Sequence, residues 1–437
     1  MVKRFENGGF APAEGRVVGL NHEGRGIVRQ GGKAVFVRGA LPGERVLYRI
    51  VKTDKRFDQA DAVRIIEASD YRRDAPCPHY GDCGGCSMQH IEFSAQVAFK
   101  QRVVEEQCLR LAKHMPEQIL PPVYGLPWHY RERGRLSAGT DGQGRLKIGF
   151  RAQKSHGIAD IDSCAVLPRH LSDVLPLLKK QLQGAAGILE GIEFALGGGV
   201  TALNLLLSAR PSEKQTGCLR GLQTRLGGDW RLSWQSPAHR GELHEGGGDL
   251  HYRLDDFGID LAFTVGSFTQ VNAALNNLMV RRALDMLAPA KGERIADLFC
   301  GSGNFSLPLA LSGAEVTGIE GLPALTSRAR ANARRNNLAN LKFLTADLFK
   351  TNAAAYEAWG KWDKILLDPP RAGAYAFAQS LRGSRLPGRI VYVSCNPATF
   401  ARDAAEFVKK GYKFKKLGII NLFSQTAHAE AVGCFER

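Results

Sequence analysis

The sequence predicts an α/β protein with a Rossmann-like sheet at its C-terminal end, preceded by an OB-like β-barrel and a central α+β region. Three observations predict this organisation. Strands and helices alternate from Glu293 onward, and three of the strands end in an acidic residue. Short strand-like segments with glycine turns fill residues 16–69. Between these two parts lies a cluster of three cysteines, Cys77, Cys83 and Cys86.

The composition favours a nucleic-acid partner. The chain has 437 residues and a formal net charge of +16, which attracts polyanions. No apolar run reaches the roughly 20 residues that span a bilayer, so we expect no membrane partner. Residues 1–10 are polar and resemble no signal peptide, so we expect a cytoplasmic protein. Nine cysteines in such a protein indicate metal binding or catalysis rather than disulfides.

The first predicted domain covers residues 10–70. Segments 16–20, 26–29, 33–37 and 45–51 read as strands, and so many strands in so short a stretch are typical of a small barrel. Residues 1–75 carry 15 Lys and Arg against 10 Asp and Glu. The pattern resembles the TRAM domain, an RNA-binding barrel. A solvated barrel surface without a ligand is the alternative.

The cysteine cluster has the spacing C-x5-C-x2-C, with glycines that let the backbone fold around a metal. Cys164 is the best candidate for a fourth ligand, since Cys108 lies at a helical core spacing. Tetrahedral zinc and a [4Fe–4S] cluster both suit four thiolates, and the single C-x2-C favours iron–sulfur. We interpret His79 and His90 as bystanders. The predicted ligands are Cys77, Cys83, Cys86 and Cys164.

The cluster belongs to a predicted central domain over residues 75–262. Within it, residues 91–115 read as one amphipathic helix, a candidate to pack on the C-terminal domain. Residues 128–154 hold seven Lys and Arg among interleaved aromatics, a composition suited to unpaired RNA. An exposed basic hairpin would explain the same stretch.

Residues 263–437 form the predicted third domain. A strand, a glycine-rich turn with Gly301 and Gly303 and a helix begin it, and the next three strands end in Glu320, Asp347 and Asp368. Acids at these positions accept hydrogen bonds from ribose and adenine. NAD is the alternative ligand, but the third glycine of its fingerprint is absent, since Asn304, Phe305 and Ser306 follow Gly303. The pattern therefore favours S-adenosylmethionine.

Two further motifs resemble the RNA (uracil-5-)-methyltransferases. One is Asp368-Pro-Pro-Arg371 followed by the strand Val391-Tyr-Val-Ser-Cys395-Asn-Pro, and the other is residues 423–430, which end in Glu430. With the barrel and the cysteines, the resemblance is strongest to the RlmD-type enzymes of 23S ribosomal RNA. It departs at Asn421, Ser424 and Ala429, where the family usually has an acid, a proline and a larger apolar residue.

The resemblance implies a reaction and a set of site residues. Methylation of uracil at C5 needs a thiol that adds to C6 and a base that later removes the C5 proton. Cys395 is the implied nucleophile and Glu430 the implied base. The implied donor-site residues are Gln270, Phe299, Asn304, Glu320, Asp347 and Asp368.

The expected enzyme is a monomer that makes 5-methyluridine in a locally unpaired segment of 23S ribosomal RNA. The same chemistry on transfer RNA is an alternative that the cysteine cluster disfavours. Another ribosomal uracil is a second alternative, disfavoured by the barrel. A non-catalytic RNA-binding iron–sulfur protein is a third, disfavoured by the presence of both Cys395 and Glu430.

Overall fold

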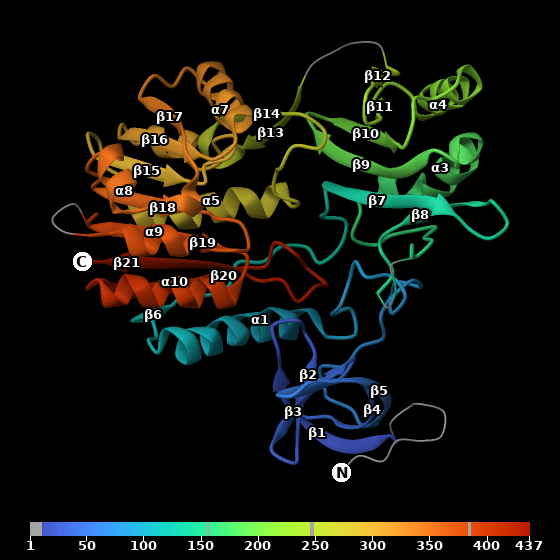
Figure 1. Ribbon diagram of the computed structural model, residues 1–437, viewed down its shortest axis with the longest axis horizontal. Coiled ribbons are helices and arrows are strands. Elements are labelled where there is room, and N and C mark those ends of the chain that lie inside the picture. The colour runs from blue at the N-terminus through green and yellow to red at the C-terminus, as the bar shows by residue number, and fades with distance from the viewer. Residues whose placement is uncertain (1–10, 154, 156, 245–248, 383–385) are drawn as a thin grey trace.

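The structure is a computed structural model that describes residues 11–153, 155, 157–244, 249–382 and 386–437. Three bodies make up the structure: a barrel, a central sheet with its helices, and a large C-terminal α/β body (Figure 1). The 1–10 segment, for which we predicted no signal peptide, lies outside the described residues. In the part of the chain that the structure describes, every helix is too short or too polar to cross a membrane.

The N-terminal body is a closed five-stranded barrel, as the sequence predicted. Its strands are arranged in the order β1-β2-β3-β5-β4. Each strand alternates buried and more exposed residues, and the inward side chains, among them Val37, Val46 and Tyr48, form a separate core. The strands are β1 (Ala13–Leu20), β2 (Gly26–Gln30), β3 (Lys33–Arg38), β4 (Arg45–Thr53) and β5 (Phe57–Glu67). The fifth strand was missed, and it closes the barrel by pairing parallel with β3.

The predicted helix over residues 91–115 is α1 (Phe93–Gln107), extended by a π-helical turn, η1 (Cys108–Ala112). The Glu92 carboxylate caps its first turn by accepting a hydrogen bond from the Ala95 amide at 3.0 Å. Its buried face, which includes Val97, Val104 and Cys108, packs into the same core as the C-terminal sheet. Cys108 is therefore a packing residue, as expected.

The central body is a six-stranded sheet in the order β12-β11-β10-β9-β7-β8, with helix α3 in contact with β8 and helix α4 in contact with β11 (Figure 1). A two-stranded sheet, β13 with β14, leads from it into the C-terminal body. The elements are β7 (Arg133–Thr140), β8 (Leu146–Gly149), α2 (Arg169–Asp173), α3 (Leu175–Leu182), η2 (Gln183–Ala185), β9 (Leu189–Gly197), β10 (Val200–Leu207), α4 (Glu213–Leu226), β11 (Trp230–Gln235), β12 (Arg240–Glu242), β13 (Leu250–Leu254), η3 (Asp255–Phe257) and β14 (Ile259–Phe263).

The C-terminal body is an eight-stranded sheet in the order β17-β16-β15-β18-β19-β21-β20-β6. The run from β17 to β19 is parallel, so the carboxyl ends of its strands share one edge. The edge strand β6 (Gln118–Ile119) comes from the N-terminal half of the chain and pairs parallel with β20. The strands are β15 (Arg294–Leu298), β16 (Glu315–Glu320), β17 (Leu341–Thr345), β18 (Lys364–Leu367), β19 (Arg389–Ser394), β20 (Lys413–Ile420) and β21 (Glu430–Glu436).

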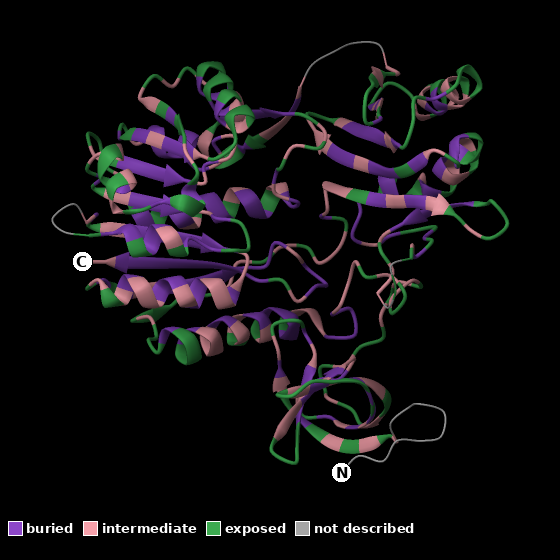
Figure 2. Ribbon diagram, in the orientation of Figure 1, coloured by how far each residue is buried: buried purple, intermediate pink, exposed green. Residues whose placement is uncertain are grey.

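Helices cover both faces of this sheet, and each face has its own core. One core holds side chains of α5 and α7, and the other holds those of α1, α9 and α10. Strands β15, β18, β19 and β21 are buried along most of their length (Figure 2), which explains their continuous apolar runs. The helices are α5 (Ala273–Leu287), α6 (Ser306–Ala310), α7 (Pro323–Arg335), η4 (Leu348–Lys350), α8 (Ala353–Trp359), α9 (Tyr375–Ser380) and α10 (Pro397–Lys409).

Candidate active site

A single cleft of about 2570 Å³ lies where the three bodies meet. Barrel residues such as Arg38 line one end, basic residues of the central body line its wall, and the carboxyl edge of the C-terminal sheet lines the other end. All eight residues that the sequence predicted for catalysis and donor binding line this cleft: Gln270, Phe299, Asn304, Glu320, Asp347, Asp368, Cys395 and Glu430. The chain therefore brings together residues that are up to 160 positions apart, from Gln270 to Glu430.

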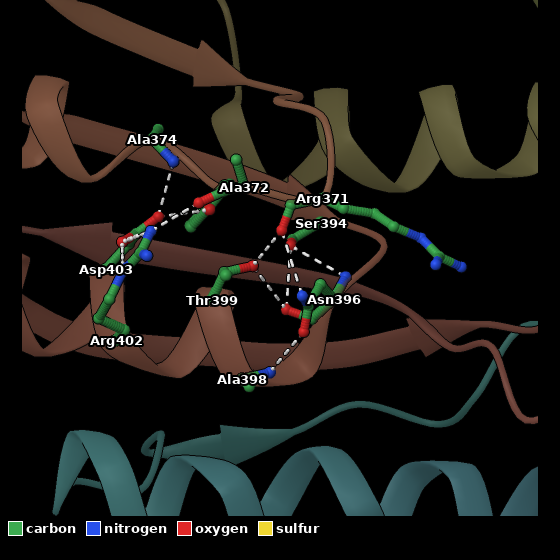
Figure 3. Close-up of polar contacts among 10 residues, drawn as sticks. Arg371, Ala372, Ala374, Ser394, Asn396, Ala398, Thr399, Arg402 and Asp403 are labelled. Atoms are coloured by element: carbon green, nitrogen blue, oxygen red, sulfur yellow. Dashed lines mark hydrogen bonds and ion pairs between the residues drawn. The ribbon is translucent and has the colours of Figure 1, made fainter. Parts of the chain in front are cut away.

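Cys395 follows directly on the buried strand β19 and is half-buried itself. The next residue, Asn396, ends the strand and caps α10, because its Oδ1 accepts a hydrogen bond from the Ala398 amide at 3.0 Å. Asn396 also donates from Nδ2 to the carbonyl of Arg371 at 3.1 Å, and Thr399 Oγ1 donates to the same carbonyl at 3.2 Å (Figure 3). The cysteine turn and the Asp368-Pro-Pro-Arg371 turn are thus fastened to each other.

A buried carboxylate holds the far end of the same turn. Asp403, on α10, accepts hydrogen bonds from the Ala374 amide at 2.7 Å and from the Tyr392 hydroxyl at 2.8 Å. Arg402 pairs with its other oxygen at 2.7 Å and also donates to the carbonyl of Ala372 at 2.8 Å. Figure 3 shows the contacts of Asp403 and Arg402 with Ala374 and Ala372 on one side, and the Arg371 side chain extending away from them. These hydrogen bonds fix the backbone of the turn, whereas the Arg371 side chain takes no part in them.

Glu430 is brought beside Cys395 by strand pairing. It is the first residue of β21, where the next residue, Ala431, pairs with Ser394, the residue before the cysteine. Its carboxyl is buried, and burial together with the nearby Asp368 raises its pKa well above the ordinary value. Burial, with Glu430 and Asp368, also raises the pKa of the Cys395 thiol to about 11. A thiol and a carboxyl that lie near each other in one cleft can add to a base and remove a proton from it.

Arg371 is the cation that opposes these shifts. Its guanidinium lowers the pKa of both Cys395 and Glu430, although burial outweighs it at each. Its Nη2 lies 3.0 Å from Nδ1 of His428, which belongs to the loop before Glu430. In the sequence, Arg371 stood out only as part of a motif, and a motif does not reveal which way a side chain is directed.

The glycine-rich turn after β15 forms the floor of the donor end. Phe299 adopts a left-handed backbone with φ of 63°, and Gly301 and Gly303 are also left-handed. The Glu320 carboxylate accepts a hydrogen bond from the Gly301 amide at 3.2 Å and another from Leu322 at 3.1 Å. These contacts fix the glutamate at the end of β16 beside the turn, where a ribose-binding carboxylate was expected.

Two other predicted donor residues flank that turn. Asp347 is exposed and caps η4 by accepting a hydrogen bond from the Phe349 amide at 3.0 Å. Phe349 in turn packs on Phe299, with the two ring centroids 5.5 Å apart. Asp368 lies at the end of β18, and burial raises the pKa of its carboxyl to about 7.

Sequence reasoning missed the side chains that position Asn304. Its Oδ1 accepts hydrogen bonds from the Tyr252 hydroxyl at 3.1 Å and from Asn276 Nδ2 at 2.9 Å, and its own Nδ2 donates back to Asn276 at 2.9 Å. Asn276 is buried in the first turn of the amphipathic helix α5. An amide on the apolar face of a helix is the signal that could have drawn attention to it.

The four candidate metal ligands do not line the cleft. Cys164 is buried, and the other three are half-buried. Burial raises the pKa of the Cys86 thiol to about 12, and the charges of Cys164, Cys83 and Cys77 add to the rise, so the four sulfur atoms are neighbours. All four are free thiols.

We tested whether these residues fit a metal. Within the described residues, no three His, Cys, Asp or Glu side chains are arranged to hold one metal ion. His79 and His90 are engaged elsewhere, with the Asp162 amide and the Tyr80 hydroxyl. The candidate metal ligands are thus the four neighbouring cysteines, without the two histidines.

Comparison with known proteins agrees with the site. Residues 251–437 match the family described as tRNA (Uracil-5-)-methyltransferase. The chain is 46% identical over 424 residues to the 23S rRNA (uracil(1939)-C(5))-methyltransferase RlmD of Neisseria lactamica, covering 95% of this chain and 94% of that one. It is also 46% identical to the RlmD protein of Azoarcus sp., over 96% of this chain and 98% of that one.

A solved structure shares the whole fold. The tRNA (uracil-54, C5)-methyltransferase of Pyrococcus abyssi, in complex with S-adenosyl-L-homocysteine, superposes with a TM-score of 0.73 at 24% identity. The match covers 97% of this chain and 100% of that chain. The fold is thus that of a uracil methyltransferase, and identities of 40–46% over nearly the full length connect the chain to curated relatives that all carry one name. The protein belongs to the RlmD family of 23S ribosomal RNA (uracil-C5)-methyltransferases.

Proposed function

We propose that this enzyme transfers a methyl group from S-adenosylmethionine to C5 of a uridine in 23S ribosomal RNA, forming 5-methyluridine. The target by analogy with the curated relatives is uracil 1939. One observation carries the proposal: Cys395 and Glu430 line one cleft together with the strand-end acids Glu320, Asp347 and Asp368. A nucleophile, a base and a nucleoside-binding edge are the parts that C5 methylation requires.

The proposed chemistry begins at the cysteine. The Cys395 thiolate adds to C6 of the uracil, and the electron pair of the C5–C6 double bond makes C5 nucleophilic. S-adenosylmethionine supplies the methyl group to C5 as its sulfonium is displaced. Glu430 then takes the remaining C5 proton, the C5–C6 double bond re-forms, and the thiolate leaves. A carboxylate with a raised pKa suits this last step, because it is a stronger base than an exposed one.

The donor site in this proposal uses the residues at the sheet edge. Glu320 would hold the ribose, Asp347 the adenine edge, and Phe299 and Asn304 the space above the glycine turn. Gln270 and Asp368 would stand between the donor and the base. Their common location in the cleft supports this assignment.

The proposed RNA path follows the basic wall of the cleft. Arginines and a lysine from the barrel and the central body line it: Arg25, Arg38, Arg131, Arg135, Lys147 and Arg151. Such cations bind phosphates, and a base must leave its helix or loop to reach a thiol at the end of the cleft. A locally unpaired RNA segment and a monomeric enzyme acting in the cytoplasm complete the proposal.

We also propose a [4Fe–4S] cluster held by Cys77, Cys83, Cys86 and Cys164. The convergence of four free thiols supports it. Anaerobically purified protein should be brown and contain iron and sulfide, and a Cys86→Ser variant should lose both. A colourless protein that contains one zinc ion would contradict this assignment.

The central experiment uses unmodified 23S ribosomal RNA and labelled S-adenosylmethionine. We expect 5-methyluridine at one position in the wild type and none with Cys395→Ser. Glu430→Gln should trap a covalent RNA–protein adduct, since addition proceeds but elimination does not. An enzyme that binds the RNA without forming 5-methyluridine would refute the catalytic function, and an adduct in Cys395→Ser would refute the nucleophile.

A further inference from the structure

The loop between β20 and β21, residues 421–429, forms the wall of the cleft beside Cys395 and leads directly into Glu430. Inside it, Gln425 is buried and adopts a left-handed backbone with φ of 65°. A residue with a side chain is strained in this conformation and keeps it only if the surroundings hold it. The structure contains such a holding device in the N-terminal half of the chain.

Gln96, on α1, holds Gln425 at two points. Its Oε1 accepts a hydrogen bond from the Gln425 amide at 3.2 Å, and its Nε2 donates to Gln425 Oε1 at 3.0 Å. The same Nε2 donates to the carbonyl of Ile91 at 2.9 Å. Only one orientation of the Gln96 amide satisfies a backbone donor and a backbone acceptor at once, so its oxygen and nitrogen are assigned unambiguously.

Ser87 and Met88, which follow Cys86, also hold Gln425 in place. The amides of Ser87 and Met88 both donate to the Gln425 carbonyl, at 2.9 and 3.0 Å. Ser87 Oγ accepts a hydrogen bond from the Ala427 amide at 3.1 Å. Gln425 is thus held at its amide, its carbonyl and its side chain by segments more than 300 positions earlier in the chain.

Two more contacts extend the same support along the loop. The Lys100 ammonium, one helical turn beyond Gln96, donates to Asn421 Oδ1 at 2.6 Å and to the Phe423 carbonyl at 2.9 Å. The Tyr130 hydroxyl donates to the Ser424 carbonyl at 2.7 Å. Helix α1 lies along the lower face of the C-terminal body, between it and the barrel (Figure 1), and so can act as a fixed support.

We propose that Gln96 is a positioning residue for the last step of catalysis: it locks Gln425, and through it the loop that encloses Glu430. The inference rests on the proposed function. With the loop locked, Glu430 stays shielded from water and directed at the reacting base. With the loop relaxed, water reaches the carboxyl, which becomes a weaker base, while Cys395, which follows β19, keeps its position. Thiol addition should therefore persist while elimination slows.

The test compares Gln96→Met, which keeps the length of the side chain but removes its hydrogen bonds, with Gln101→Met. Gln101 lies on the same helix, and its amide donates to Glu105 within that helix. We expect kcat of Gln96→Met to fall roughly 10- to 100-fold, as for a small displacement of a catalytic group, with KM within about twofold. The covalent RNA adduct should accumulate as in Glu430→Gln, and Gln101→Met should behave as the wild type.

A second variant distinguishes positioning from loss of folding. In Gln96→Met/Gln425→Gly, glycine adopts the left-handed backbone without strain, so kcat should recover at least about threefold over Gln96→Met. If Gln96→Met yields no folded protein, Ser87→Ala, which removes one hydrogen bond of the grip, should show the same adduct to a lesser extent.

Three results would overturn the proposal: an unchanged kcat in Gln96→Met, a loss of adduct formation, or an effect on KM alone. The wild type and Glu430→Gln are assayed in parallel, so that failure of the Gln96 proposal can be told apart from failure of the proposed methyltransferase function. If they make product and trap adduct, the uracil chemistry stands and only the role of Gln96 falls.

Discussion

Asp297 offers a sharp test of the electrostatics at the donor end. It is fully buried on β15 beneath the glycine turn, and Ser306 Oγ donates to its Oδ2 at 2.5 Å. Its Oδ1 has no hydrogen-bond partner among the described residues. Burial, with smaller contributions from Asp368 and Glu320, raises the pKa of its carboxyl to about 7. The ionised form is therefore disfavoured in the folded protein.

The sign and size of the effect follow from the two pKa values. A raised folded pKa contributes stability that is fully present below the unfolded value of 3.8 and is lost as the pH rises to about 7. For a folded pKa of about 7, the free energy of unfolding falls by about 2 to 3 kcal/mol between about pH 5 and about pH 8 from this group alone. Asp297→Asn has no charge to bury and should lack this loss.

The assay is urea unfolding of the wild type and Asp297→Asn without S-adenosylmethionine, at about pH 5 and about pH 8. We expect the difference in unfolding free energy to move by about 2 to 3 kcal/mol in favour of the variant at the higher pH. Asp255→Asn, at a carboxylate whose side chain is 81% exposed, is the control and should show almost no pH-dependent difference. If the Asp297→Asn difference is independent of pH, the carboxyl is ionised throughout and the reasoning is wrong.

Three other predictions concern the catalytic turn and its support. Gly373 has φ of 78°, and a Cβ there would stand 2.5 Å from Asp403 Oδ2. Gly373→Ala should therefore lower the free energy of unfolding, measured in urea, by about 2 to 4 kcal/mol, and it should also reduce kcat. Arg371 lowers the pKa of Cys395, so Arg371→Met should shift the rising limb of the kcat/KM–pH profile upward by about one unit. Burial lowers the pKa of Lys100 to about 7. The free energy of unfolding that this group contributes is therefore lost as the pH falls toward that value. The unfolding free energy of Lys100→Met should therefore gain about 1 kcal/mol on the wild type from about pH 8 to about pH 6.

The Gly373 and Arg371 predictions each have a matched control variant. A Cβ at Gly388 would stand 3.6 Å from the Asp363 carbonyl oxygen, an ordinary contact, and its φ is not left-handed, so Gly388→Ala should change stability by less than about 0.5 kcal/mol. Arg371→Lys keeps the charge and should keep most of the pH profile. An unshifted profile in Arg371→Met would show that the guanidinium does not act on the thiol. A pH-independent difference in Lys100→Met would show that the lysine stays charged across the range.

The fold of the C-terminal body was predictable because its signals are local. Each parallel strand is a short apolar run that ends in a polar residue, and the carboxyl ends of such strands must meet at one edge. This reasoning placed Glu320, Asp347 and Asp368 correctly at the cleft. The barrel was predictable from strand spacing, although β5 was missed.

What the sequence did not reveal depends on contacts between distant segments. Asn276 and Tyr252 orient Asn304, and Gln96 meets Gln425 across 329 positions. Neither set of contacts follows a helix or strand periodicity or a motif spacing, so a single sequence does not reveal it. The two-residue strand β6 is too short to show any alternation, so its place in the sheet is decided by pairing with β20 alone.

The position of β6 and α1 has a consequence for how the protein can be divided. The segment 93–119 precedes the central body in the chain but completes the sheet and one core of the C-terminal body. A fragment beginning at residue 251, where the family match begins, would expose the apolar surface that α1 covers and leave β20 as an open edge. Transplanting the catalytic unit onto another RNA-binding module would therefore require carrying this early segment along. The three bodies are separable in space, yet the chain encodes the catalytic one in two pieces.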